Sequence, residues 1–268
     1  MCATCGCGDD GATITLTDGH HQHHHPHPDD GHPHRHAHTD TVSLDQKVLA
    51  KNDQLAAQNR QWLTERHILA LNLTSSPGSG KTTLLERTIR ELGRSRSVAV
   101  IEGDQETLLD AERIRATGAR AIQVNTGAGC HLDAAMVRRA LETLAPPRDS
   151  LLFIENVGNL VCPALFDLGE SGKIVVISVT EGADKPLKYP HMFAAAALVV
   201  VNKSDLLPYV DFDVDTFTTH ARSINPGVDI LTLSATTGEG IPKWYDWIDI
   251  RANEAVSHGS VDKTMPPE

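Results

Sequence analysis

Residues 75–83, SSPGSGKTT, have the composition and order of a phosphate-binding loop. They follow the apolar run ILALNLT and precede a stretch of helical periodicity, the strand–loop–helix setting that such loops require. Glycines let backbone N–H groups turn toward phosphate oxygens, a lysine reaches the β- and γ-phosphates, and a threonine hydroxyl coordinates Mg²⁺. The alternative is a glycine-rich helix N-cap without a ligand. We predict that the nucleotide is bound by Pro77, Gly78, Ser79, Gly80, Lys81, Thr82 and Thr83, with Thr82 also on Mg²⁺.

Two later segments predict that the base is guanine. Residues 202–205, NKSD, end the apolar run ALVVV, and Asp205 can accept from the ring N–H and the exocyclic amine of guanine. Asn202 would support the base edge, and the stem of Lys203 would lie against the ring. Ser234 and the backbone N–H of Ala235, in LSATT, fit a second guanine loop. Taken alone, NKSD could also be a polar strand end.

The groups expected at the γ-phosphate are less regular. Glu155-Asn156-Val157-Gly158 follows the run SLLFI, where G-proteins carry Asp-x-x-Gly. Glu155 could hold Mg²⁺ through a water, and the Gly158 N–H could sense the γ-phosphate. Asp104 is a second Mg²⁺ candidate, or else a helix N-cap. With Lys81 these form the expected catalytic set. No Gln or Arg is obviously placed to orient water, so we expect slow GTP hydrolysis to GDP.

The chain has five cysteines, three of them close to its N-terminus. Cys2, Cys5 and Cys7 with the terminal amine could supply four ligands. A tetragonal arrangement suits Ni²⁺ and a tetrahedral one Zn²⁺, and the sequence leaves the geometry open. A reactive terminus without metal is the alternative.

A second metal set is expected within the folded part. Cys130 and His131 follow the run ARAIQV, and Cys162 lies downstream of Glu155 in ENVGNLVCP. Both loops should leave the carboxyl ends of their strands, on the same edge as the phosphate loop. Movement of Cys162 with the γ-phosphate could then change metal affinity. The alternative is two structural cysteines and a capping histidine.

A histidine-rich run precedes the domain. Imidazole ligates Ni²⁺ and Zn²⁺ well, and a flexible tether would raise the metal concentration near the domain. A purification tag is disfavoured because Pro, Asp and Arg interrupt the run. We expect a low-specificity reservoir formed by His20, His21, His23, His24, His25, His27, His32, His34, His36 and His38.

Apolar runs and helical stretches alternate from Ile68 onward. Near-continuous apolar strands separated by helices predict an α/β fold, a doubly wound and mostly parallel sheet with helices on both faces, as in P-loop NTPases. Strands are expected at 68–74, 97–102, 120–125, 150–155, 173–179, 197–202 and 228–233. Helices are expected at 81–92, 106–117, 132–144, 213–223 and 241–250.

The same pattern divides the chain into four parts. Residues 1–40 lack apolar periodicity and are expected to form a flexible, Cys/His-rich metal-binding tail. Residues 41–67 predict an amphipathic helical lead-in, 68–250 the GTPase domain and 251–268 a polar tail.

Composition excludes several classes of function. The chain has 268 residues and a net charge of −11, which argues against nucleic acid as a partner. No apolar run reaches the about 18 residues that a membrane span needs. The N-terminus has neither the basic nor the apolar region of a signal peptide, so we expect a cytoplasmic protein.

Several segments together resemble the HypB-type hydrogenase nickel-incorporation GTPases, which have a SIMIBI-class P-loop fold. The likeness covers about residues 1–250, and GCHLD with ENVGNLVCP is its most specific part. Ser75 agrees with the family where a strict phosphate loop has glycine. The segments are MCATCGC, the histidine run, SSPGSGKTTLL, VIEGDQ, NTGAGCHLDA, FIENVGNLVCP, EGADKPLKYP and VNKSDLLP.

The resemblance implies nickel delivery to [NiFe]-hydrogenase, and hence the hydrogenase large subunit as client. It also implies dimerisation promoted by GTP and a HypA-type partner that exchanges nickel. By the same resemblance the three N-terminal cysteines form a tight nickel site, and Cys130, His131 and Cys162 a weaker, nucleotide-linked one. Many relatives lack the histidine run or the cysteine motif, which indicates a variant that also buffers nickel.

Two other functions fit parts of this pattern. The first is a nickel storage protein with a secondary nucleotide site. The second is a urease-accessory GTPase, a class with a similar phosphate loop but a Cys-Pro-His metal motif. Residues 161–164 read Val-Cys-Pro-Ala, which disfavours the second.

Overall fold

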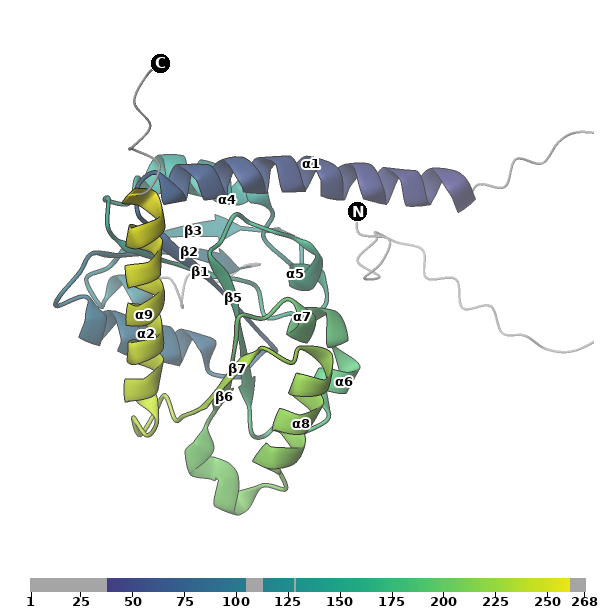
Figure 1. Cartoon of the computed structure of the whole chain (residues 1–268), viewed down its shortest axis with the longest axis vertical. Coiled ribbons are helices and arrows are strands. Elements are labelled where there is room, and N and C mark those ends of the chain that lie inside the picture. The colour runs from purple at the N-terminus through teal and green to yellow at the C-terminus, as the bar shows by residue number, and fades with distance from the viewer. Residues whose placement is uncertain (1–37, 105–112, 128, 261–268) are drawn as a thin grey trace, which may run out of the picture.

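The computed structural model describes residues 38–104, 113–127 and 129–260. Its centre is a seven-stranded sheet in which every pairing is parallel, with the order β3-β2-β4-β1-β5-β6-β7 (Figure 1). The expected α/β fold is therefore confirmed. The strands are β1 Leu69–Ser75, β2 Val98–Asp104, β3 Arg120–Asn125, β4 Leu151–Glu155, β5 Gly172–Ser178, β6 Leu198–Asn202 and β7 Asp229–Thr232.

The central strands are buried on both faces, as their unbroken apolar runs predict. Every residue of β1, β4 and β6 is buried. Such strands cannot alternate between core and solvent, so helices must cover both faces of the sheet.

Helices cover both faces. α2 and α9 bury apolar side chains against one face. Side chains of α1 and α4, and of α7 and α8, pack in two clusters against the other. The elements are α1 His38–Thr64, α2 Lys81–Leu92, α4 Ala134–Leu144, α5 Cys162–Leu165, α6 Lys185–Lys188, α7 Pro190–Ala194, the 3₁₀ helix η1 Ser204–Tyr209, α8 Val214–Ile224 and α9 Ile241–Ser260.

Two buried asparagines attach α1 to the domain. Asn59 donates to the carbonyls of Ala134 (2.9 Å) and Leu168 (3.1 Å), and Asn52 donates to that of Asp167 (2.8 Å). The first half of α1 extends beyond the body of the molecule (Figure 1). The amphipathic pattern of residues 41–67 thus corresponds to a helix with one packed end and one projecting end.

The C-terminal helix is longer than its sequence pattern indicates. A polar tail is expected from residue 251, but α9 continues to Ser260. Ala252 and Ala255 pack against the core, and Arg251 lies over the ring of Trp247. Ala252 and Ala255 thus keep the end of α9 packed on the core, although the polar composition of this segment predicts a tail.

Some expectations fall outside the described residues. They include Cys2, Cys5 and Cys7, most of the histidine run, the first part of the expected helix 106–117 and residues 261–268. His38 begins α1, but its side chain is not among those described.

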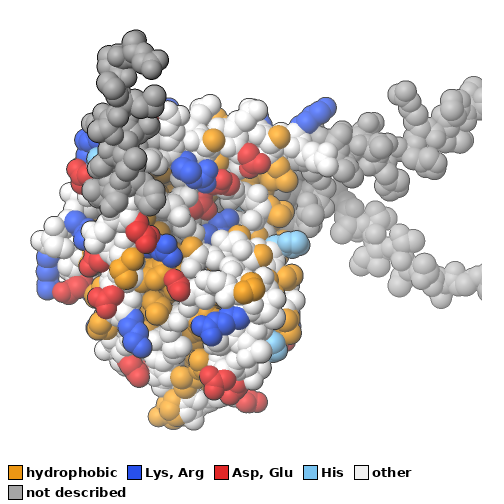
Figure 2. All heavy atoms as spheres, in the orientation of Figure 1, with side chains coloured by type: hydrophobic (Ala, Val, Ile, Leu, Met, Phe, Trp, Pro, Cys, Tyr) orange, Lys and Arg blue, Asp and Glu red, His pale blue; other side chains and the backbone are white. Residues whose placement is uncertain are grey.

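The surface mixes charges of both signs. Figure 2 shows basic and acidic side chains interspersed with apolar ones over the face that carries α9 and α8. Within the described ranges, no helix combines the length and the apolarity needed to cross a bilayer.

Candidate functional site

The carboxyl ends of the strands converge on the predicted nucleotide site. The loop after β1 connects to α2, and β1 pairs with β4 so that Leu73 is opposite Glu155. Ligands bind at this edge of doubly wound sheets, where neighbouring loops diverge. Topology alone therefore brings the phosphate loop and Glu155 together.

The phosphate loop depends on a glycine at its end. Gly80 precedes α2 with φ 91°, a left-handed conformation that favours glycine. A Cβ on Gly80 would lie 2.5 Å from Nδ2 of Asn202. Both the backbone angle and the space thus require glycine at this position.

Lys81 and Thr82 meet the carboxylate predicted for the Mg²⁺ position. Nζ of Lys81 lies 3.2 Å from Oε1 of Glu155, and the Thr82 hydroxyl donates to the same oxygen at 2.6 Å. The Glu155 side chain is buried, and that of Lys81 is 12% exposed. The sequence prediction that these three residues share a site is consistent with this geometry.

The free oxygen of Glu155 tests whether the site suits Mg²⁺. Oε2 of Glu155 is buried and accepts no hydrogen bond from the described residues. Mg²⁺ prefers carboxylate and hydroxyl oxygens, so Glu155 and Thr82 fit this ion. Asp104 ends β2 at this same edge of the sheet, but its side chain is outside the described part of the structure.

An open cleft of about 590 Å³ surrounds these groups. Two charged residues that line it are not predicted from the sequence: Glu102, near the end of β2, and Arg113, which donates to Glu86 at 2.8 Å. Glu102 lies within the segment VIEGDQ but has no predicted role there, and Arg113 belongs to no motif, so the fold reveals their place in the cleft. The other lining residues are 75–83, Gly103, 155–158 and Lys203.

The two guanine segments join each other and the phosphate loop through Asn202. Its Nδ2 donates to the Ser79 carbonyl at 2.8 Å, and its Oδ1 accepts the Ala235 N–H at 3.0 Å. Both polar ends of this amide, and the N–H expected to face the base, are therefore engaged within the protein. Asn202 thus connects three loops, and its support of the base edge stays a prediction.

The remaining residues predicted to recognise the base have the following contacts, and their role stays a prediction. Oδ1 of Asp205 is buried and accepts no hydrogen bond from the described residues, so it is available to a donor. Nζ of Lys203 donates to the Gly78 carbonyl at 2.7 Å. The buried hydroxyl of Ser234 accepts the Thr237 N–H and shapes the second loop.

Gly158 lies directly beneath the phosphate loop. A Cβ at Gly158 would be 3.3 Å from atoms of Pro77. The loop that carries Gly158 continues into α5, which begins at Cys162. One short segment therefore connects the expected γ-phosphate sensor with a predicted metal ligand.

Cys130, His131 and Cys162 form one cluster. Their ligand atoms all lie within 4.8 Å of one another, and the two Sγ atoms are 2.8 Å apart. The His131 ring lies against that of Phe166, tilted by 31°, with ring centroids 4.0 Å apart. Residues from two loops thus meet as predicted, and two thiols with one imidazole suit Ni²⁺ or Zn²⁺.

Burial also favours the form of His131 that binds metal. Desolvation lowers the pKa of His131 below its ordinary value, and the charge of Asp133 opposes part of that shift. The neutral imidazole that a metal requires is therefore stabilised.

Four buried polar residues hydrogen-bond to one another or to the loops of the cluster, and the sequence motifs assign them no role. A polar residue inside an apolar strand pattern, as in LALNLT and GKIVVIS, is a signal that could have found the two that lie in strands, Asn72 and Lys173. The four are Asn72, Asn156, Glu170 and Lys173.

The sequence matches a known family model. Residues 69–232 match CobW/HypB/UreG, nucleotide-binding domain. The chain is 58% identical over 211 residues to hydrogenase maturation factor HypB of Rhizobium leguminosarum bv. viciae, which covers 79% of this chain and 71% of that one. It is 60% identical over 202 residues to HypB of Escherichia coli K12, covering 75% and 70%.

Two solved structures are similar in fold and sequence. HypB from Archaeoglobus fulgidus superposes with a TM-score of 0.71 and 41% identity, over 76% of this chain and 99% of that one. HypB from Helicobacter pylori in complex with nickel has a TM-score of 0.71 and 36% identity, over 76% and 96%.

The thiol geometry can be tested without nucleotide or metal. Because the Cys130 and Cys162 sulfurs nearly touch, we expect a mild thiol oxidant to link them into a disulfide, the S–S bond being about 2.05 Å. The full chain should carry Cys2→Ala, Cys5→Ala and Cys7→Ala, so that mass spectrometry reads only this pair. A Cys130→Ser version is the control, and two thiols still open to alkylation after oxidation would contradict the geometry.

Proposed function

Because the chain belongs to the CobW/HypB/UreG family, and within it to the HypB hydrogenase maturation factors, we propose that it is a nickel metallochaperone whose GTP hydrolysis times metal release. One observation carries the proposal: the segment 155–162 lines the nucleotide cleft at one end and supplies Cys162 to the metal cluster at the other. A nucleotide-dependent shift of this segment would change the ligand geometry. Zn²⁺ suits the same donor set and is proposed as a second metal.

Each nucleotide-site residue has a proposed role. Lys81, which contacts Glu155, would bind the β- and γ-phosphates, and Glu155 and Thr82 would hold Mg²⁺. The Gly158 N–H binds the γ-phosphate, and Asp205 accepts from guanine. Bound Mg²⁺ would supply neutralisation of the charge that develops on the phosphates.

The metal sites are proposed to differ in task. Cys130, His131 and Cys162 would hold the ion that is delivered to the hydrogenase large subunit, with a HypA-type protein as exchange partner. The N-terminal cysteines and histidines would capture and buffer nickel. The H. pylori relative solved with nickel supports nickel as the cargo.

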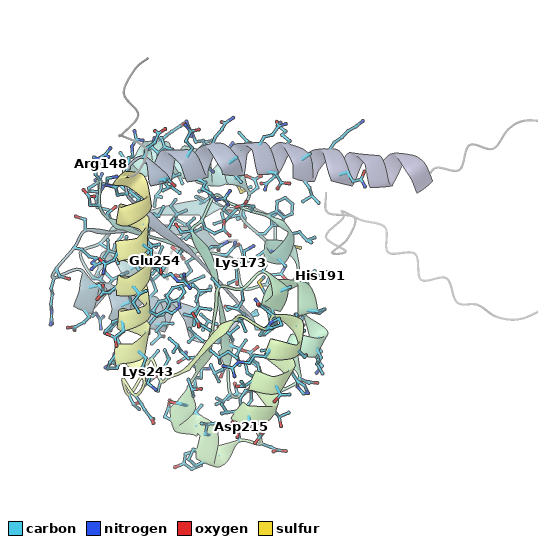
Figure 3. The ribbon with its side chains drawn as sticks, in the orientation of Figure 1. Arg148, Lys173, His191, Asp215, Lys243 and Glu254 are labelled. Atoms are coloured by element: carbon cyan, nitrogen blue, oxygen red, sulfur yellow. The ribbon has the colours of Figure 1, made fainter. Side chains whose placement is uncertain are left out.

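Substitution of Lys81 distinguishes a protein that delivers nickel from one that only stores it. We expect Lys81→Ala to lower GTP hydrolysis by about 100- to 1,000-fold, since it removes a charge that stabilises the transition state, and to abolish hydrogenase maturation. Nickel bound by the full chain, measured by equilibrium dialysis, should stay unchanged. Lys243→Ala, at the exposed start of α9 (Figure 3), is the control. Normal maturation with Lys81→Ala would support nickel storage instead.

Asp205 tests the base assignment. In Asp205→Asn the amide can donate to the carbonyl that replaces the amine in xanthine. We expect GTP affinity to fall by about 10- to 100-fold and xanthosine triphosphate to bind better, measured by competition with a fluorescent nucleotide. Asp215→Asn, an exposed change on α8 (Figure 3), should alter neither. Unchanged GTP affinity in Asp205→Asn would rule out guanine recognition by this carboxylate.

The family resemblance also leads us to propose a nucleotide-dependent dimer. We expect GTP with Mg²⁺ to shift the protein toward dimer and GDP to leave it monomeric, as measured by sedimentation velocity. Lys81→Ala with GTP should behave as the wild type does with GDP. The same sedimentation with either nucleotide would contradict a nucleotide-dependent dimer.

A further inference from the structure

Asn156 occupies the junction between the nucleotide loop and the metal loop. It follows Glu155 directly, its side chain is 1% exposed, and its backbone N–H continues the sheet by donating to Leu73 at 2.9 Å. Its neighbours Val157 and Gly158 line the nucleotide cleft. Asn156 therefore joins the sheet to the part of the loop that lines the cleft.

One oxygen of Asn156 holds both loops. Oδ1 accepts the N–H of Val157, in the nucleotide loop, at 3.0 Å. The same oxygen accepts the N–H of Leu132 at 3.2 Å, and Leu132 directly follows Cys130 and His131. Because Leu132 is fully buried, its N–H has no access to water if Asn156 moves away.

The nitrogen of the same amide is linked to the core. Nδ2 donates to Oδ1 of Asn72 at 3.4 Å, and Nδ2 of Asn72 donates to Glu170 at 3.0 Å. Glu170 also accepts the Leu168 N–H at 2.7 Å. The two shorter bonds to its oxygen, from Val157 and Leu132, therefore set the orientation of the Asn156 amide, and the longer contact with Asn72 is compatible with it.

The Cys162 side of the cluster is anchored differently. Lys173, a buried residue of β5, donates to the carbonyls of Pro163 (2.8 Å) and Phe166 (3.3 Å), on and just after α5. Figure 3 labels Lys173 in the interior, beside β5. Nζ of Lys173 also lies 3.7 Å from Glu170. The helix that carries Cys162 is therefore clamped to the sheet.

We propose that Asn156 is the positioning residue that transmits the nucleotide state to the metal cluster. The inference rests on the proposed function, and it names the group through which coupling passes. A shift of Val157 toward or away from the γ-phosphate moves the shared oxygen, and the buried Leu132 N–H must follow it. Cys130 and His131 then move relative to Cys162, because Lys173 holds the Cys162 end of segment 155–162 while its Val157 end shifts.

A second contact between the two loops is weaker. Nδ2 of Asn159 donates to the Cys130 carbonyl at 3.4 Å. This distance is at the limit of a hydrogen bond, and water can replace the contact because Asn159 is only half-buried. The buried oxygen of Asn156 is accordingly the stronger link.

The test measures nickel affinity in two nucleotide states. The full chain carries Cys2→Ala, Cys5→Ala and Cys7→Ala, so that thiolate-to-nickel absorption reports only Cys130 and Cys162. Nickel is titrated with Mg²⁺-GDP and with a slowly hydrolysed GTP analogue. We expect the two dissociation constants to differ by a factor within the range of about 5 to 150 that is typical of allosteric coupling.

Asn156→Ala should bring that ratio close to unity while nickel still binds. By linkage, nickel should also stop affecting the affinity for the GTP analogue. Asn225→Ala is the matched control, because it removes an amide that donates to the Phe193 (3.1 Å) and Ala196 (2.9 Å) carbonyls and to neither of the two loops. An intact ratio in Asn156→Ala, or an equal loss in Asn225→Ala, would overturn the proposal.

A second measurement uses no substitution at Asn156. In the metal-free protein, hydrogen exchange at the Leu132 amide should differ between GDP and the GTP analogue, and identical exchange would overturn the proposal. Failure of the proposed function is distinguishable, since wild-type nickel affinity would then be the same with both nucleotides. A wild-type ratio that survives Asn156→Ala refutes only the role of Asn156.

Discussion

The register between β1 and β4 decides whether the nucleotide cleft can form. Leu73 is opposite Glu155, so the loop that follows β1 rises directly beside this carboxylate. A slip of one residue would turn Glu155 to the other face of the sheet. Lys81 and Thr82 would then lose the oxygen that both contact. Buried apolar side chains on both faces of β1 and β4 fix the register, so the packing of the core determines the chemistry at its edge.

Loops at this edge also depend on buried amides that connect them. Asn202 joins the phosphate loop to the loop of Ala235, and Asn156 joins the nucleotide loop to that of Leu132. A side-chain amide has both donors and acceptors, so one residue can satisfy backbone groups of two loops. Losing such a residue would leave buried backbone groups without partners, which costs more than one hydrogen bond contributes.

The sequence predicts what is local and misses what depends on tertiary contacts. All seven strands and the phosphate loop were predicted from apolar runs and short motifs, because backbone propensity and spacing decide them. The approach of Cys130 and His131 to Cys162 followed from the rule that parallel strands end at one edge. The orientation of Asn202, the position of Arg113 and the length of α9 depend on partners distant in sequence. No local pattern contains them.

The buried pair of Glu170 and Lys173 shows why polar groups persist in this core. A buried ion pair is weak evidence for stability, because desolvation offsets its attraction and apolar side chains of similar volume would often stabilise the fold as well. Apolar replacements could not accept from Asn72 and the Leu168 N–H, or donate to the Pro163 and Phe166 carbonyls. Glu170 thus holds the Asn72 amide beside Asn156, and Lys173 holds the helix that carries Cys162. The pair defines the position of backbone segments, and position matters more than stability where ligand atoms must meet within a few ångströms.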